Sequence, residues 1–200
     1  MTERTPSPRR GRLMLIGVAA LFFVPLAVAW WMFLGLDRVP ADEVVANGEL
    51  VRPARPLGDF TLPPVGEHAP VTDESLHGRW TIVYVGTTAC DDACERTLWE
   101  ARQVRTRLGR DASRVQRVFV LAGGDAVDDP AFFAREHGDM PLVRADDAWL
   151  APFRVDDEPA SGHLYLVDPL GNLLMRYGAD APPEALLDDL KRLLRVSRIG

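Results

Sequence analysis

Two cysteines that lie four residues apart carry the clearest chemical signal in this sequence. Cys90 and Cys94 are the only cysteines among its 200 residues. They follow Thr-Ile-Val-Tyr-Val (81–85), which is typical of a buried strand, and they precede a stretch that predicts a helix. If Cys90 caps that helix and Cys94 lies in its first turn, the i, i+4 spacing brings the two side chains together. Such a pair holds Cu(I) as two thiolates, forms a reversible redox disulfide, or forms a disulfide that only stiffens the turn.

Charges near the pair act on its thiols in opposite directions. A helix N-terminus stabilises the thiolate, which is the reactive and metal-binding form of cysteine. Asp91, Asp92 and Glu95 add negative charge beside the pair, and nearby negative charge raises the pKa of a thiol. Acidic residues are also common as ordinary helix-start residues. The sequence therefore leaves two roles open for these three carboxylates.

The elements that must position the pair predict one α/β domain over residues 57–200. The order strand, helix, strand, helix, hairpin, helix fits a thioredoxin-like sandwich. The hairpin is expected around Pro169-Leu170-Gly171-Asn172. In this arrangement the Cα atoms of the two cysteines should lie within about 7 Å. The expected strands are 57–62, 81–85, 115–122, 141–145, 163–167 and 173–177, and the expected helices are 92–108, 129–137 and one opened by Pro182-Pro183.

The N-terminal part predicts a membrane anchor. Residues 13–36, LMLIGVAALFFVPLAVAWWMFLGL, carry no charge, and a helix of that length spans about 36 Å. Four arginines in residues 1–12 place this tail in the cytoplasm by the positive-inside rule. The rival interpretation is a signal peptide cleaved after Ala27-Val28-Ala29. The apolar run continues through residues 30–34, which favours an uncleaved anchor in a bacterial inner membrane.

The remaining chain is acidic and is expected on the outer, periplasmic side. Residues 37–56 contain prolines and mixed charge without a sustained period, and they predict a periplasmic stalk. Without the tail, 19 basic and 28 acidic residues remain, a formal charge of −9. Because phosphate binding requires a basic surface, this balance argues against a nucleic-acid partner.

Three segments resemble the Sco/SenC family. They are the edge-strand segment 57–62, Gly-Arg-Trp-Thr-Ile-Val-Tyr-Val-Gly-Thr-Thr-Ala-Cys-Asp-Asp-Ala-Cys (78–94) and His-Leu-Tyr-Leu-Val-Asp-Pro-Leu-Gly-Asn (163–172). The resemblance covers about residues 57–196. It implies a membrane-anchored, thioredoxin-like protein that assists assembly of the copper site of cytochrome c oxidase.

The sequence departs from this family at two positions that bear on copper. The family usually has proline directly after the first cysteine, where this chain has Asp91. The family's third copper ligand is a histidine that falls on Ala160 here. His163, three residues later, is the candidate for a displaced ligand beside Cys90 and Cys94. A surface or packing histidine is the other interpretation of His163, and the offset leads us to expect at most a two-thiolate site.

Three functions follow from these features. The first is a Sco-like accessory protein whose Cys90 and Cys94 bind Cu(I) or exchange disulfides with the copper-site subunit of cytochrome c oxidase. The second is a membrane-tethered thiol–disulfide oxidoreductase that acts on another periplasmic thiol protein without a stable copper role. The third is a binding module in which the cysteines are structural. Only the thiol–disulfide reaction would make this chain an enzyme.

Overall fold

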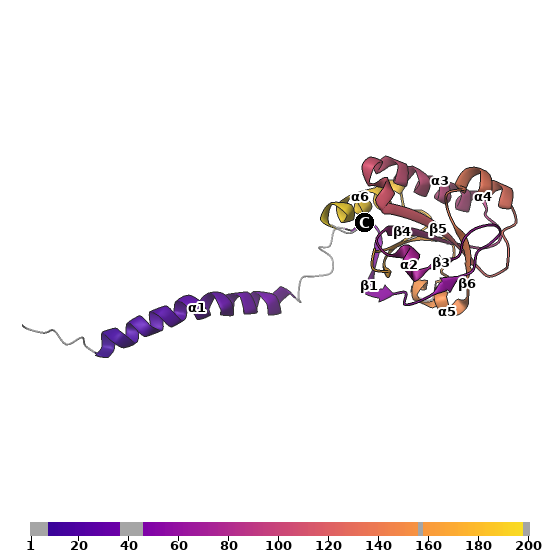
Figure 1. Ribbon diagram of the computed structural model, residues 1–200. Helices are drawn as coiled ribbons and strands as arrows, with labels where there is room; N and C mark the ends of the chain where they lie inside the picture. The colour runs from indigo at the N-terminus through magenta and orange to yellow at the C-terminus, as the bar shows by residue number, and fades with distance from the viewer. Residues whose placement is uncertain (1–7, 37–45, 156–157, 198–200) are drawn as a thin grey trace, which may run out of the picture. The chain divides into compact units, whose positions relative to one another are not determined.

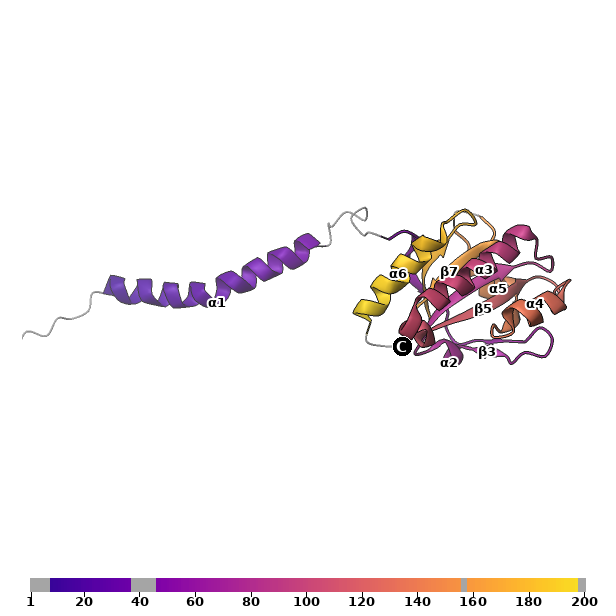
Figure 2. The same cartoon turned by 90° about the horizontal axis from the view of Figure 1, so that it is seen from above.

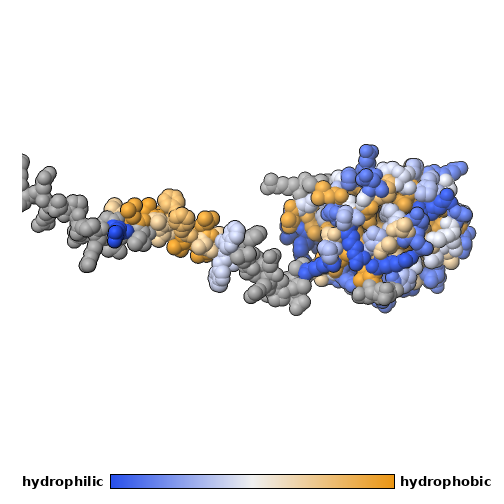
Figure 3. Space-filling model, turned by 90° about the horizontal axis from the view of Figure 1, so that it is seen from below, coloured by the Kyte–Doolittle hydropathy of each residue, from blue (hydrophilic) through white to orange (hydrophobic). Residues whose placement is uncertain are grey.

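The structure, a computed structural model, describes residues 8–36, 46–155 and 158–197. The chain divides into two compact units, Met1–Val45 and Ala46–Gly200. In the first unit, α1 (Pro8–Leu36) is one helix that contains Pro25 and the whole uncharged run. The larger apolar side chains described in it are exposed, which gives its surface the hydrophobic colour in Figure 3.

No helix among the described residues combines the length and the apolar character that a membrane span requires. The anchor expected at residues 13–36 stays a prediction. Residues 1–7 of the expected tail and residues 37–45 of the expected stalk lie outside the described residues.

The second unit is built on a six-stranded mixed sheet in the order β1-β8-β7-β4-β5-β6. The strands β4, β5 and β6 are parallel, β7 is antiparallel to β4, and β7 and β8 form the expected antiparallel hairpin. The central position of β4 explains its continuous run of buried residues. The bounds are β1 (Glu49–Pro56), β4 (Trp80–Gly86), β5 (Val115–Ala122), β6 (Leu142–Ala145), β7 (His163–Val167) and β8 (Asn172–Tyr177).

Helices cover the sheet on one face, and short elements cover the other (Figures 1 and 2). The first face packs α3 (Asp92–Arg107), α4 (Pro130–His137) and α6 (Pro183–Val196) against the sheet. The three helices lie close to their expected positions. The second face carries small elements that sequence patterns did not predict: β3 (Val71–Thr72), α2 (Asp73–Leu76), α5 (Asp147–Leu150) and η3 (Ala151–Phe153).

The alternation of side chains along the strands divides the core between these two faces. On β4, Ile82 and Tyr84 pack under the helices, whereas Val83 and Val85 pack on the other face. Because strand residues alternate in direction, the same division applies to β7. Each fully buried aliphatic side chain in these clusters contributes about 1.5–3 kcal/mol to folding.

The boundary of the domain differs from the expected one. The compact unit begins at Ala46 rather than at residue 57, because β1 pairs with β8 at the edge of the sheet. The prediction of a stalk is therefore wrong for residues 49–56. The prolines of this segment are compatible with an edge strand, where one side of the backbone needs no partner. The expected strand at 57–62 is also reduced to β2 (Thr61–Leu62), which pairs with β3 in a separate two-stranded sheet.

A buried carboxylate ties the start of β1 to the last helix. Asp189 on α6 is 3% exposed. It accepts hydrogen bonds from the Asn47 and Gly48 backbone N–H groups at 3.0 and 2.9 Å and from the Tyr177 hydroxyl at 3.0 Å. Burial and the Asp189 charge raise the pKa of Tyr177 above its ordinary value. These bonds supply the partners that a buried carboxylate requires.

Candidate functional site

The cysteine pair lies in the turn between β4 and α3, at the carboxyl end of the parallel strands. Residues 87–91 form this turn directly after Gly86. The carbonyl oxygen of Thr88 accepts a hydrogen bond from the Asp128 N–H at 2.9 Å. This bond joins the turn to the loop that follows β5. The turn is therefore held by the neighbouring strand connection as well as by its own helix.

Cys90 and Cys94 form a disulfide in this turn. Their Cα atoms are 5.1 Å apart, within the expected limit. Cys94 is 5% exposed and packs in the core cluster under the helices, whereas Cys90 is only partly buried against the same cluster. Cys90 is therefore the more accessible of the two cysteines.

The helix cap is Asp91 and not Cys90. The Asp91 side chain accepts the Cys94 N–H at 2.9 Å, and α3 begins at Asp92. The carboxylate thus fills the usual role of an N-cap. The expected cap at Cys90 is corrected by one residue, because a thiol is a weaker acceptor than a carboxylate. Cys94 still lies in the first turn, as expected.

The carboxylates around the turn oppose the helix N-terminus electrostatically. Burial, together with the charge of Asp91, raises the pKa of Tyr84 to about 12. Burial is the larger of these two causes. Asp91, Asp92 and Glu95 are exposed, so solvent screens their effect on the cysteines. The N-terminus of α3 and these acids act on the same sulfur atoms with opposite sign.

His163 lies on the other face of the sheet from the disulfide. It is the first residue of β7 and pairs with Val85 of β4, whose side chain belongs to the second face. Directly opposed residues on paired strands point to the same side. Its ring accordingly lies near Tyr165, with 6.2 Å between ring centroids. The structure therefore brings Cys90 and Cys94 together and does not bring His163 to them.

Both nitrogens of His163 have polar neighbours on this second face. Nδ1 lies 3.0 Å from the Ser161 carbonyl oxygen, which is only an acceptor, so the ring donates there. Nε2 lies 3.9 Å from a Glu158 carboxylate oxygen, which also pairs with Arg176 at 3.0 Å. Among the described residues, no three His, Cys, Asp or Glu side chains are grouped so that they could hold a metal ion.

A buried tyrosine organises the segment that precedes His163. The Tyr165 hydroxyl donates to the carbonyl oxygens of Ala160 and Phe153, at 2.9 and 3.0 Å. Burial raises the pKa of Tyr165 to about 12. Ala160 is 5% exposed and packs in the second-face cluster. In the sequence, Tyr165 stands out only as part of the motif at 163–172, although a tyrosine within an apolar strand often needs a partner for its hydroxyl.

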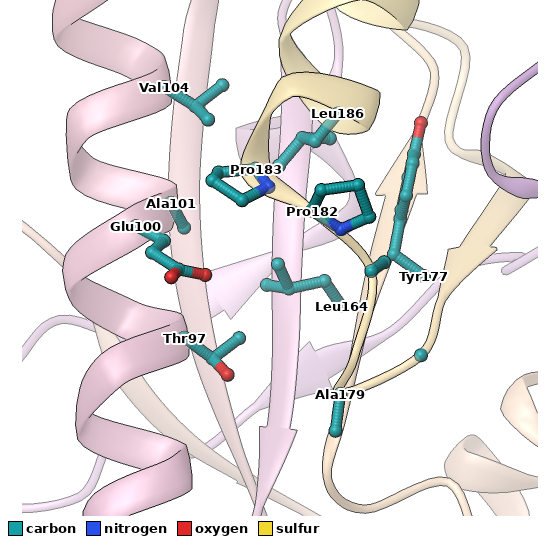
Figure 4. A pocket seen from close by; sticks show the side chains of 12 residues that line it. Thr97, Glu100, Ala101, Val104, Leu164, Tyr177, Ala179, Pro182, Pro183 and Leu186 are labelled. Carbon is teal, nitrogen blue, oxygen red and sulfur yellow. The ribbon is translucent and has the colours of Figure 1, made fainter.

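The seam between α3 and the start of α6 is too small for a ligand. Thr97 and Glu100 line it from α3, Leu186 lines it from α6, and Leu164 and Tyr177 line it from the sheet (Figure 4). The enclosed space is about 20 Å³, which is close to the room that one water molecule requires. We interpret this seam as packing between two helices.

Comparison with known proteins gives the family of the chain. Residues 80–197 match the family described as "Transmembrane-like, thioredoxin-like, C-terminal domain", and residues 6–35 match the "Transmembrane-like, N-terminal domain". A curated relative, the "Putative copper-binding protein" of Stutzerimonas stutzeri, is 33% identical over 144 residues. The match covers 62% of this chain and 69% of the relative.

Solved structures of Sco proteins have the same fold. The apo Sco1 structure of Thermus thermophilus has a TM-score of 0.59 at 19% identity and covers 74% of this chain and 97% of its own. Copper-bound yeast Sco1 has the same TM-score and identity, with coverage of 74% and 96%. At this identity the comparison concerns the fold, and it confirms the thioredoxin-like architecture that the motifs predicted. The chain thus belongs to the family of thioredoxin-like domains preceded by a transmembrane-like N-terminal domain, and its fold is that of the Sco proteins.

Proposed function

We propose that this protein is a membrane-anchored, periplasmic accessory factor for assembly of the copper site of cytochrome c oxidase. The observation that carries the proposal is the Cys90–Cys94 pair at the strand-to-helix turn of a Sco fold. The copper-binding description of the 33% identical relative supports it. The client would be the copper-site subunit of the oxidase or another periplasmic thiol protein.

The geometry of the pair determines how a disulfide exchange would proceed. A client thiolate attacks the sulfur of Cys90, because Cys90 is more exposed than Cys94. The Cys90–Cys94 bond breaks, and Cys94 leaves as a thiolate in the first turn of α3, where the helix N-terminus stabilises it. The second client thiolate then attacks the client sulfur of the mixed disulfide and releases Cys90.

This sequence transfers two electrons. The client ends as a disulfide and the pair as two thiols, and the protons of the client thiols pass to solvent and to the cysteines. The same steps in reverse reduce a client disulfide. After reduction, the two soft thiolates are ligands suited to Cu(I) as cargo. His163 contributes no third ligand in this arrangement because it lies on the opposite face.

A thiol–disulfide oxidoreductase without a stable copper role is the second candidate. Two departures of the sequence from the Sco/SenC pattern favour it: Asp91 stands where the family usually has proline, and Ala160 stands where the family has its histidine ligand. The two candidates differ in whether the reduced pair holds Cu(I).

Copper binding by the reduced full chain tests the choice. We expect the chain in uncharged detergent to bind Cu(I) in anaerobic competition with a chromogenic chelator. Cys90→Ser and Cys94→Ser should each weaken binding at least ~100-fold, or ~2.8 kcal/mol, since one thiolate is lost from a pair. Thiol exchange with dithiothreitol should vanish in the same variants. Exchange without Cu(I) binding would select the oxidoreductase, and the absence of both would leave a structural disulfide.

The proposed topology has its own test. Protease added to spheroplasts should digest the domain of residues 46–200 and leave the N-terminal segment protected. The charge-free run at 13–36 and the match to a transmembrane-like family support this expectation. A mature N-terminus at Trp30 would instead show that the segment is a cleaved signal.

A further inference from the structure

A surface groove runs between α3 and α4, beside the first turn that contains Cys94. Its volume is about 610 Å³. Asp92 and Glu95 line it from the start of α3, and Trp99 lines it one turn further along. The two helices lie side by side (Figures 1 and 2), and the Arg102 guanidinium donates to the Glu136 carbonyl oxygen at 2.8 Å between them.

Trp99 is an exposed aromatic side chain on α3, the helix whose first turn contains Cys94. It is 55% exposed. Among the described residues of the second unit, the other large apolar side chains that are at least as exposed are Leu170 and Val196.

Trp99 lies five residues after Cys94, or about 7.5 Å along the helix axis. An extended segment covers that distance in two to three residues. Five residues also rotate the helix by about 500°, so Trp99 points about 140° away from Cys94 around the helix. The groove reaches the first turn of α3 through Asp92 and Glu95, which lie on either side of Cys94 in the sequence. A client segment that lies along the groove from Trp99 to Asp92 therefore ends beside the turn that contains the disulfide.

The groove is negative in balance. Four carboxylates line it, against the two guanidinium groups of Arg96 and Arg135. Glu136 pairs with Arg135 at 3.0 Å and with Arg102 at 3.9 Å. The excess of negative charge therefore comes from Asp92, Glu95 and Asp129 against Arg96. A cationic side chain is the complement of this surface, both for the carboxylates and for the face of an exposed indole. The carboxylates are Asp92, Glu95, Asp129 and Glu136.

Because the acidic groove, the exposed Trp99 and the disulfide lie along the same helix, we propose that the groove binds a basic segment of the client protein. This segment would adjoin the client's own reactive cysteines, and Trp99 would be its main apolar contact. The inference rests on the proposed function for the identity of the client, and it adds the surface and the chemistry by which the client is recognised. Tryptophan is enriched among side chains that carry most of an interface's binding energy. Opposite charge around it directs the segment into register.

Peptides without cysteine test the groove separately from thiol chemistry. The first probe is a fluorescein-labelled 12-residue peptide with several lysines, one leucine and serine in place of cysteine. The second has glutamate at every lysine position. With the oxidised full chain in uncharged detergent, and empty micelles as the blank, we expect the lysine peptide to bind at least ~10-fold tighter by anisotropy. Equal binding of the two peptides would overturn the proposal.

Variants locate the binding. Trp99→Ala should weaken the lysine peptide at least ~10-fold, whereas Trp99→Phe should retain most of the affinity. The matched control is Leu170→Ala. Leu170 is an apolar side chain that is 65% exposed. It lies in the β7–β8 turn, which contacts Gly78 before the start of β4, whereas the cysteines follow the end of β4. This control variant should change affinity less than ~2-fold. An equal effect of Trp99→Ala and Leu170→Ala would overturn the assignment to this groove.

A second arm separates failure of the groove from failure of the proposed function. The wild-type chain is tested with dithiothreitol and with Cu(I). Loss of both activities would remove the proposed function whatever the peptides do. If the cysteines exchange thiols or bind Cu(I) but the two peptides bind equally, only the proposal about the groove is overturned.

Discussion

The disulfide and His163 both lie near the carboxyl end of β4, but they lie on opposite faces of the sheet. On the helical face, the disulfide follows β4 and packs against the core beneath α3. On the other face, His163 pairs with Val85 and lies beside Tyr165. Nearness along the strand does not create one site from these residues. Alternate side chains of a strand point to opposite faces, so the sheet itself lies between the disulfide and His163.

The second difference between the faces is the environment of their histidines. His137 on α4 is 1% exposed, whereas the side chain of His163 is 17% exposed and has the Glu158 carboxylate as a neighbour. We expect His137 to affect the stability of the fold, whereas local polar contacts hold the ring of His163. The predictions below separate these roles.

The largest effect is expected from acid acting on His137. Burial, followed by the charges of Arg117 and Arg102, lowers the pKa of His137 to about 4, while Asp139 and Glu136 oppose the shift. Because the native pKa lies below the unfolded value of about 6.5, the unfolded state binds the proton first as the pH falls. The free energy of unfolding should therefore fall by about 3 kcal/mol between pH 7 and pH 4 from this group alone.

Urea unfolding of wild type and His137→Gln at several pH values measures this contribution. The variant should lack the part of the acid sensitivity that belongs to His137. Parallel pH curves for the two proteins would contradict the buried, neutral state of this histidine.

Removing the Tyr165 hydroxyl should destabilise the second face. Tyr165→Phe leaves the carbonyl oxygens of Phe153 and Ala160 without this donor in a buried site. The expected loss is about 2 kcal/mol in the free energy of unfolding. Cu(I) affinity should remain unchanged, because the cysteines lie on the other face. A large loss of copper affinity in a folded Tyr165→Phe chain would break the separation of the faces.

The helical face offers a smaller, two-part test at Asp91. Asp91→Ala removes the cap of α3 and should cost about 1 kcal/mol of stability. Asp91→Asn keeps an acceptor for the Cys94 N–H, so its stability should stay within a few tenths of a kcal/mol of the wild type, on the order expected for exchanges between good caps. Asn also removes the charge, so alkylation of the reduced cysteines should begin at lower pH. An unchanged alkylation profile would show that solvent screens Asp91 completely.

The smallest effect is expected at His163. His163→Ala should weaken Cu(I) binding less than tenfold, or about 1.4 kcal/mol, because the ring lies on the face away from both sulfurs. The Cys90→Ser variant, measured by the same chelator competition, supplies the scale. A loss greater than tenfold would mean that the segment before β7 rearranges to bring His163 to copper.

Most of the helical face could be predicted from the sequence. The β-branched run at 81–85 and the four-residue spacing of the cysteines at the start of the helix predicted at 92–108 are local patterns. A helix-start role is one of the two roles that the sequence leaves open for Asp91, and the spacing predicts the cap at Cys90 instead. The carboxylate competes better for the Cys94 N–H, which local spacing alone did not settle.

The edge of the sheet and the second face were predicted less well. The strand β1 contains two prolines, so its pattern resembled a stalk until pairing with β8 made it an edge strand. Ala160 lies in the turn before β7 and packs in the second-face cluster, and β7 begins at His163. The face on which the start of β7 lies depends on its pairing with β4, which the local spacing of residues does not give.

The sequence by itself determined the local elements of this protein: an uncharged run long enough for an anchor, the strands and helices of an α/β domain, and two cysteines spaced to meet at a helix start. Only the tertiary structure decided which face each candidate ligand occupies, how Asp189 receives the start of β1, and that α3 and α4 leave a negative groove beside Trp99. The physical reason is range. Periodicity and capping act over a few neighbouring residues, whereas pairing partners and groove walls come from residues that are distant along the chain.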